Sequence, residues 1–104
     1  MEHKTKRNNR KLKIKEIVGT LKDNKKEIKM YSVDKLGVFG SYIKGNQSKD
    51  SDIDFLVRFE NTNFDNYIGL KLFLEKLFKK KVDLVVERNL KSDFKYVKKE
   101  AIYV

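Results

Sequence analysis

The chain lacks cysteine and proline altogether, and it has a single histidine, His3, in a polar N-terminal stretch. Without cysteine there is no disulfide framework and no thiolate zinc site. A single histidine in that position removes His-based general acid–base catalysis and most transition-metal sites. No apolar run approaches the roughly 18 residues of a membrane span, and the N-terminus lacks the apolar core of a signal peptide. The chemistry that remains is that of carboxylates with a hard cation, in a protein that we expect to be cytoplasmic.

Positive charge is in excess, with a net charge of +10 over 104 residues. Attraction to the phosphates of a nucleotide or a nucleic acid, or to an acidic partner, would explain it. Solvated faces of a lysine-rich protein would explain it equally well, because the lysines are spread along the whole chain. The length predicts one domain over residues 1–104 with a modest core. We expect residues 1–8 to be flexible.

Apolar residues recur at helical spacing in three segments. The helices are predicted over residues 9–29, 64–79 and 92–101. Asn8 or Asn9 can cap the first helix, Asn63 the second and Ser92 the third, because their side chains can accept hydrogen bonds from free N–H groups of the first turn.

Three apolar runs read as strands. They are predicted over residues 35–39, 52–59 and 81–86. The order helix, strand, strand, helix, strand, helix predicts an α/β (α+β) sandwich. We expect a small mixed sheet of three to four strands, with the helices mainly on one face and the functional site on the other.

The most informative stretch runs from Gly40-Ser41 to Asp52-Ile53-Asp54. Side chains alternate between the faces of a strand, so Asp52 and Asp54 should point the same way. Two carboxylates side by side repel each other unless a cation lies between them. Mg²⁺ suits this arrangement, because it binds one or two carboxylates and completes its coordination with substrate phosphate oxygens. The Gly-Ser turn would let backbone N–H groups approach those phosphates.

Asp83 is an anomaly, because it interrupts the apolar run of the third predicted strand. A buried and unpaired acid costs several kcal/mol. Asp83 must therefore lie at the surface, be paired, or belong to a metal site.

Gly-Ser, ten residues and then Asp-x-Asp resembles the signature of the nucleotidyltransferase superfamily with the DNA-polymerase-β-like palm. In so short a chain it is most similar to the minimal nucleotidyltransferases, small proteins usually paired with a HEPN-domain toxin. The better-understood members act as antitoxins. The resemblance covers residues 35 to the C-terminus and implies the nucleotidyltransferase palm fold.

The resemblance also implies roles for the acidic residues. Asp52 and Asp54 would hold one or two Mg²⁺ ions. Asp83 falls where the family has a third carboxylate, as a metal ligand or as a group that helps to deprotonate the attacking hydroxyl. The sequence leaves those two roles of Asp83 open.

Four further residues are candidates for nucleotide binding. Gly40 and Ser41 would hold the triphosphate, and Ser51 lies directly before the Asp-x-Asp pair. Lys44 stands where relatives often carry arginine, so it could neutralise phosphate but would lack the bidentate geometry. Ser41 and Gly45 could also serve only the geometry of the turn and the loop.

The activity that the resemblance implies is transfer of AMP from ATP to a hydroxyl, a tyrosine of the cognate HEPN toxin, which silences the toxin. One alternative is an antitoxin that acts by binding alone, with an idle metal site. Another is a transferase acting on RNA ends or on a small molecule. A membrane partner is not expected, and a nucleic-acid partner stays open without being favoured.

Overall fold

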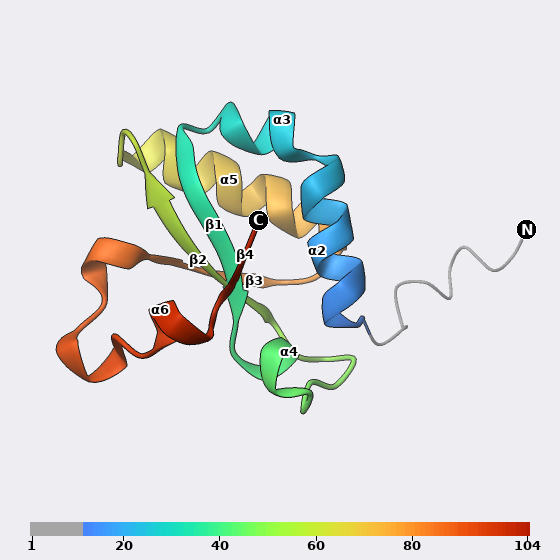
Figure 1. The fold of residues 1–104 in the computed structure, drawn as a ribbon. Helices are drawn as coiled ribbons and strands as arrows, with labels where there is room; N and C mark the ends of the chain where they lie inside the picture. Colours follow the sequence, from blue (N-terminus) through green and yellow to red (C-terminus); the bar gives the residue numbers. More distant parts are fainter. Residues whose placement is uncertain (1–11) are drawn as a thin grey trace, which may run out of the picture.

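A four-stranded mixed sheet organises residues 12–104, the part of the chain that this computed structural model describes. The strand order is β3-β2-β1-β4 (Figure 1). The strands are β1 (Val33–Phe39), β2 (Ile53–Phe59), β3 (Val82–Val86) and β4 (Ile102–Tyr103). β1 runs antiparallel to both β2 and β4, whereas β2 and β3 are parallel. The parallel pair needs a crossover between its strands, and helix α5 provides it.

The helices are of very different lengths. They are α2 (Ile14–Asp23), α3 (Lys25–Lys29), α4 (Ser41–Lys44), α5 (Phe64–Phe78), the 3-10 turns η2 (Glu87–Asn89) and η3 (Ser92–Phe94), and α6 (Val97–Glu100). Helices α2, α3 and α5 lie together on one side of the sheet (Figure 1). Within residues 12–104 no helix is both long enough and apolar enough to span a membrane.

One face of the sheet forms the core with these three helices. Alternate strand residues supply it, because side chains one residue apart point to opposite faces. The buried cluster comprises Ile17, Leu21, Ile28, Leu36, Val38, Tyr42, Ile53, Phe55, Val57, Phe59, Leu70, Leu74, Val82, Leu84 and Val86. The predicted α/β architecture, with helices mainly on one face, is confirmed.

Helix α5 begins at its predicted cap and packs along the edge strand β3. The Asn63 side chain accepts a hydrogen bond from the backbone N–H of Asn66 at 2.8 Å. The Tyr67 hydroxyl donates to the carbonyl of Leu84 at 2.7 Å, and the N–H of Val82 donates to Glu75 Oε2 at 3.1 Å. Two side chains of the helix thus bind backbone groups of β3 directly.

The first predicted helix, over residues 9–29, is wrong in its extent. Helix α2 starts only at Ile14, and Asn24 separates α2 from α3 with φ −114° and ψ 23°. The side chain of Asn24 donates to the carbonyl of Thr20 at 2.8 Å, so it competes with the backbone bonds that would continue the helix. The predicted cap, Asn8 or Asn9, and the flexible stretch 1–8 lie outside the described residues.

The third predicted helix, over residues 92–101, is also wrong. The structure has the short turn η3 and then α6, and Ser92 is the first residue of η3 rather than a cap. Val97 is the only buried residue between 91 and 100, so no apolar stripe stabilises a longer helix. The tail instead forms β4, in which Ile102 pairs with Val38. A sheet of three to four strands was predicted, and four are present.

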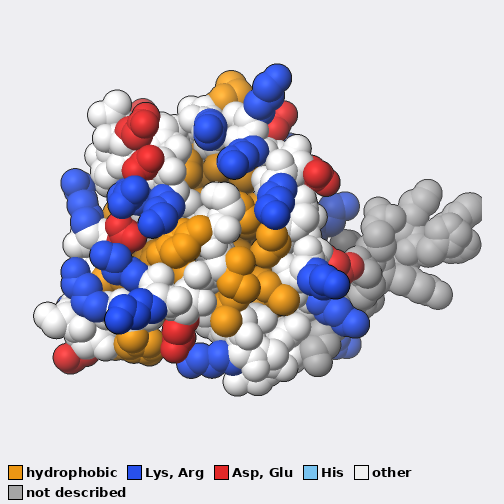
Figure 2. Space-filling view, viewed as in Figure 1, with side chains coloured by type: hydrophobic (Ala, Val, Ile, Leu, Met, Phe, Trp, Pro, Cys, Tyr) orange, Lys and Arg blue, Asp and Glu red, His pale blue; other side chains and the backbone are white. Residues whose placement is uncertain are grey.

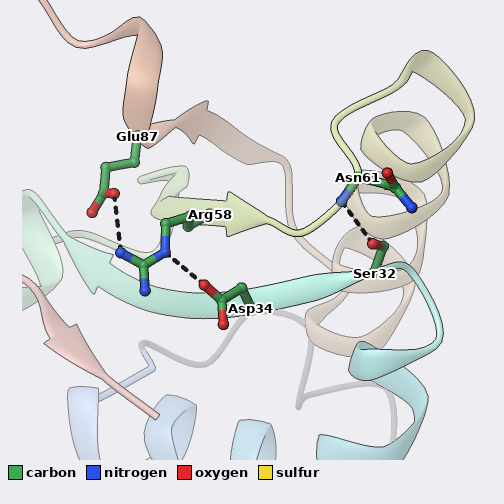
Figure 3. Close-up of polar contacts among 5 residues, drawn as sticks. All are labelled: Ser32, Asp34, Arg58, Asn61 and Glu87. Carbon is green, nitrogen blue, oxygen red and sulfur yellow. Dashed lines mark hydrogen bonds and ion pairs between the residues drawn. The ribbon is translucent and has the colours of Figure 1, made fainter.

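The face of the sheet away from α5 carries charged side chains. Arg58 on β2 donates from Nε to Asp34 Oδ2 at 2.7 Å, and its Nη1 lies 3.8 Å from Glu87 Oε1 (Figure 3). The hydrogen bond to Asp34 and the negative charge of that residue raise the pKa of Arg58. Figure 2 shows Lys and Arg side chains on both flanks of the viewed face with apolar side chains between them, so the charge there is not confined to one stripe.

Candidate active site

The predicted Gly-Ser turn joins the end of β1 to helix α4. Gly40 has φ 81° and ψ −146°, a conformation that is essentially restricted to glycine. A Cβ atom on Gly40 would lie 2.1 Å from Asp54 Oδ2. The carboxylate of Asp54 therefore packs against the bare backbone of the turn, and the two halves of the predicted motif meet in space.

The sheet register brings two of the three predicted aspartates together. Asp54 on β2 pairs with Phe39 of β1 on one side and with Asp83 of β3 on the other. Asp54 is half-buried, while Asp83 and Asp52 are exposed. Asp52 stands immediately before β2, which begins at Ile53. The structure thus resolves the anomaly of Asp83, which lies at the surface beside another carboxylate.

Burial and neighbouring negative charges act together on Asp54. Burial, followed by the negative charges of Asp83 and Asp52, raises the pKa of Asp54 from 3.8 to about 6. Each cause disfavours the ionised form, because removing a charge from water or placing it beside like charges costs free energy. The site therefore favours the approach of a cation.

The donor set suits Mg²⁺. All three side chains offer carboxylate oxygens, the ligands that hard cations prefer, and the negative charges of Asp83 and Asp52 add to the effect of burial in raising the pKa of Asp54. Among residues 12–104, no three acidic or histidine side chains already stand arranged as a metal site. The chemistry of the residues therefore fits the ion.

Sequence reasoning missed Tyr42, a buried residue of α4 near the candidate site. Its side chain is only 1 % exposed, and its hydroxyl donates to the carbonyl of Ser51 at 3.3 Å. Burial raises the pKa of Tyr42, and the negative charges of Asp52 and Asp54 raise it further. The hydroxyl therefore interacts electrostatically with both carboxylates. In the sequence Tyr42 is only a residue within the spacer, and no local pattern distinguishes it.

The four predicted nucleotide-binding residues divide into two groups. Gly40 precedes α4 and packs against Asp54, Ser41 is the first residue of this four-residue helix, and Lys44 is exposed at its end. The hydroxyl of Ser51 accepts a hydrogen bond from the N–H of Ser48 at 2.9 Å. Ser51 therefore has a partner within its own loop, and its role toward a nucleotide stays a prediction.

Comparison with known proteins extends the local match to nearly all of the described residues. Residues 13–104 match the model of the nucleotidyltransferase domain family. The protein adenylyltransferase MntA of Thermococcus cleftensis is 42% identical over 96 residues, which cover 89% of this chain and 97% of the relative.

Two solved structures share the fold. A structure assigned as a minimal nucleotidyltransferase has a TM-score of 0.76 and 31% identity, covering 88% of this chain and 95% of that chain. A toxin–antitoxin structure with AMP-PNP has a TM-score of 0.62 and 26% identity, covering 88% of this chain and 72% of that chain. The chain therefore belongs to the nucleotidyltransferase family, and it is a homologue of the protein adenylyltransferase MntA. The predicted membership is confirmed.

Replacing Asp54 by Asn should stabilise the metal-free protein at neutral pH. Because the pKa of Asp54 is raised to about 6, the folded state binds this proton more tightly than the unfolded chain. That stabilisation is complete below pH 3.8 and is lost as the pH rises toward 6. The variant Asp54→Asn has no carboxyl group to ionise at this position. We therefore expect its free energy of unfolding to exceed that of the wild type by on the order of 1 kcal/mol at pH 7.5, after allowance for solvent screening.

Thermal melts in EDTA at several pH values would measure this effect. A gain of 1 kcal/mol corresponds to about 4–8 °C in Tm for a domain of this size. The difference between variant and wild type should disappear near pH 4. Asp50→Asn, at an exposed aspartate of the neighbouring loop, serves as the control and should show no such trend. An equal Tm difference at pH 4 and pH 7.5 would contradict the raised pKa of Asp54.

Proposed function

We propose that the protein transfers AMP from ATP to a tyrosine hydroxyl of a cognate HEPN toxin, with Mg²⁺, and so acts as an antitoxin. The observation that carries the proposal is the packing of Asp54 against the Gly40 backbone, with Asp83 in register on the next strand. In this geometry a carboxylate lies beside the turn whose N–H groups would receive phosphate. The relative named protein adenylyltransferase MntA and the toxin–antitoxin structure with AMP-PNP support this choice of reaction and partner.

The reaction is a displacement at the α-phosphate of ATP. The hydroxyl oxygen forms a bond to the α-phosphorus, the bond to the bridging oxygen breaks, pyrophosphate leaves, and the hydroxyl proton is released. Gly40 and Ser41 would bind the triphosphate through the turn, and Lys44 would add positive charge. Asp52, Asp54 and Asp83 would hold Mg²⁺, which when bound supplies charge neutralisation at the phosphate oxygens. Asp83 has two candidate roles, as a ligand or as the acceptor of the hydroxyl proton.

Binding alone is the second candidate mechanism for an antitoxin. Helix α5 presents Phe64 and Leu72, which are 74% and 58% exposed. Exposed apolar side chains of this size suit protein contact, and they belong to the helix on the opposite side of the sheet from the aspartates. A partner docked there could be neutralised without any transfer.

A transfer assay separates the two mechanisms. The protein would be mixed with Mg²⁺, α-labelled ATP and the product of the neighbouring gene, with Asp52→Asn/Asp54→Asn beside the wild type. We expect label on the neighbour's band, reduced by about a thousandfold in the variant, which corresponds to about 4 kcal/mol of transition-state stabilisation. Asp50→Asn should label as the wild type does. A stable complex without label would replace the proposal by the binding mechanism.

A further inference from the structure

The loop that leads into the aspartates is attached to three separate parts of the molecule. We define the pre-aspartate loop as residues 47–51, between α4 and β2. The buried side chain of Gln47 donates through Nε2 to the carbonyl of Leu12 at 2.9 Å. The Tyr42 hydroxyl donates to the carbonyl of Ser51 at 3.3 Å, and Lys80 Nζ donates to the carbonyl of Lys49. Two of these attachments hold carbonyl groups within three residues of Asp52.

Asp52 is the aspartate whose position depends on this loop. Asp54 is fixed by the sheet, because its backbone lies between paired residues of β1 and β3. Asp52 precedes the first residue of β2 and has no partner in either register. The next backbone bond along the chain joins the N–H of Ile53 to the carbonyl of Lys81 at 3.2 Å. On its N-terminal side, the pre-aspartate loop alone sets where the carboxylate of Asp52 stands.

We propose that Lys80 and Tyr42 are positioning residues, which fix Asp52 by holding the pre-aspartate loop from two sides. Lys80 reaches the loop from the turn between α5 and β3, and Tyr42 reaches it from α4. Hydrogen bonds from an ammonium group are stronger than neutral ones, and the ring of Tyr42 is locked in the core. The kinetic consequence of this inference rests on the proposed transfer activity, whereas its structural consequence does not.

Lys79 and Lys80 form a matched pair for the test. Lys80 is partly buried and bound to the loop, while Lys79 is exposed, and its side chain has no hydrogen bond or ion pair to any other residue of the 12–104 range. Lys80→Met and Lys79→Met remove the same charge from neighbouring positions. Lys80→Arg keeps a donor that can reach the carbonyl of Lys49. Tyr42→Phe removes only the hydroxyl.

Amide hydrogen exchange of the metal-free protein is the first readout. The N–H groups of Ser48, Asp50 and Ser51 have acceptors within the loop at 2.9 to 3.3 Å, so the wild type should protect them. We expect exchange at these amides to rise about tenfold or more in Lys80→Met and Tyr42→Phe. Lys79→Met should match the wild type, and Lys80→Arg should recover most of the protection.

Steady-state transfer is the second readout. We expect kcat to fall about 10- to 100-fold in Lys80→Met, because misplacing a reacting group by about 1 Å has effects of this size. The KM for ATP should stay within about twofold, since Gly40, Ser41 and Asp54 are held by other elements. Unchanged exchange in Lys80→Met, or an equal rise in Lys79→Met, would overturn the inference.

The two proposals fail in different ways. In one case, the loop amides lose their protection from exchange only in Lys80→Met and Tyr42→Phe, and the wild type transfers nothing to any acceptor. This result would refute the proposed function and support the positioning role. Normal exchange and normal kcat in Lys80→Met, beside strong transfer by the wild type, would support the function and refute the positioning role.

Discussion

Gly40→Ala should lower transfer at least a hundredfold, whereas Gly45→Ala should leave most of it. Both glycines have positive φ, 81° and 78°, so alanine strains the backbone at either position. They differ in their surroundings. A Cβ on Gly40 would lie 2.1 Å from Asp54 Oδ2, while a Cβ on Gly45 would have nothing within 4 Å. The carboxylate must move in the first variant and need not move in the second.

Both the activity and the stability of the two glycine variants must be measured. Gly45→Ala should lose about 1 kcal/mol of stability, or roughly 4–8 °C in Tm, with kcat near that of the wild type. Gly40→Ala should lose more stability, because ψ −146° takes Gly40 outside the left-handed helical region. Transfer is assayed well below both Tm values. A folded Gly40→Ala protein with wild-type kcat would show that Asp54 does not need its contact with the turn.

Tyr42→Ala should cost about 3–5 kcal/mol of unfolding free energy, the usual loss when a buried aromatic side chain is truncated. This is a large part of the 5–15 kcal/mol that stabilises a typical domain. Tyr42 is among the largest fully buried side chains, and it belongs to a helix of only four residues. A helix of this length is not stable by itself. The packing of the Tyr42 ring in the core therefore holds α4 in place.

Denaturant unfolding with Tyr42→Phe as the control measures the packing contribution. The phenylalanine variant keeps the ring and loses one hydrogen bond, which should cost about 1 kcal/mol. The difference between the two variants is then the packing of the ring. If Tyr42→Ala proved as stable as Tyr42→Phe, the anchoring of α4 by the core would be wrong.

Features with a local signal were predicted well from the sequence. The alternation of the buried Ile53 with the half-buried Asp54, and the cap at Asn63, depend on neighbouring residues alone. The first helix was overextended because its apolar spacing continues past Asn24, whose competing hydrogen bond to Thr20 the spacing does not reveal. The fourth strand was not assigned, since two residues pair with β1 only once the sheet exists.

The sequence predicted candidate residues for the site, but none of the contacts that hold them in place. The spacing of Gly40 and Asp54 indicated the motif, yet the register that sets Asp83 beside Asp54 is a long-range property. Lys80 binds the loop across 31 positions of sequence, and no periodicity or composition encodes such a contact. Tyr42 looks like an ordinary aromatic residue until its hydroxyl is placed near two carboxylates.

The hydrogen bonds from α5 to β3 affect how the protein can associate with other copies of itself and with partners. β3 is an edge strand, and such edges readily accept a further strand from another chain. Here Tyr67 occupies the carbonyl of Leu84 and Glu75 occupies the N–H of Val82. An incoming strand would have to displace both side chains before it could pair. This edge is thereby protected against sheet-to-sheet aggregation, and a partner protein must recognise side chains rather than extend the sheet there.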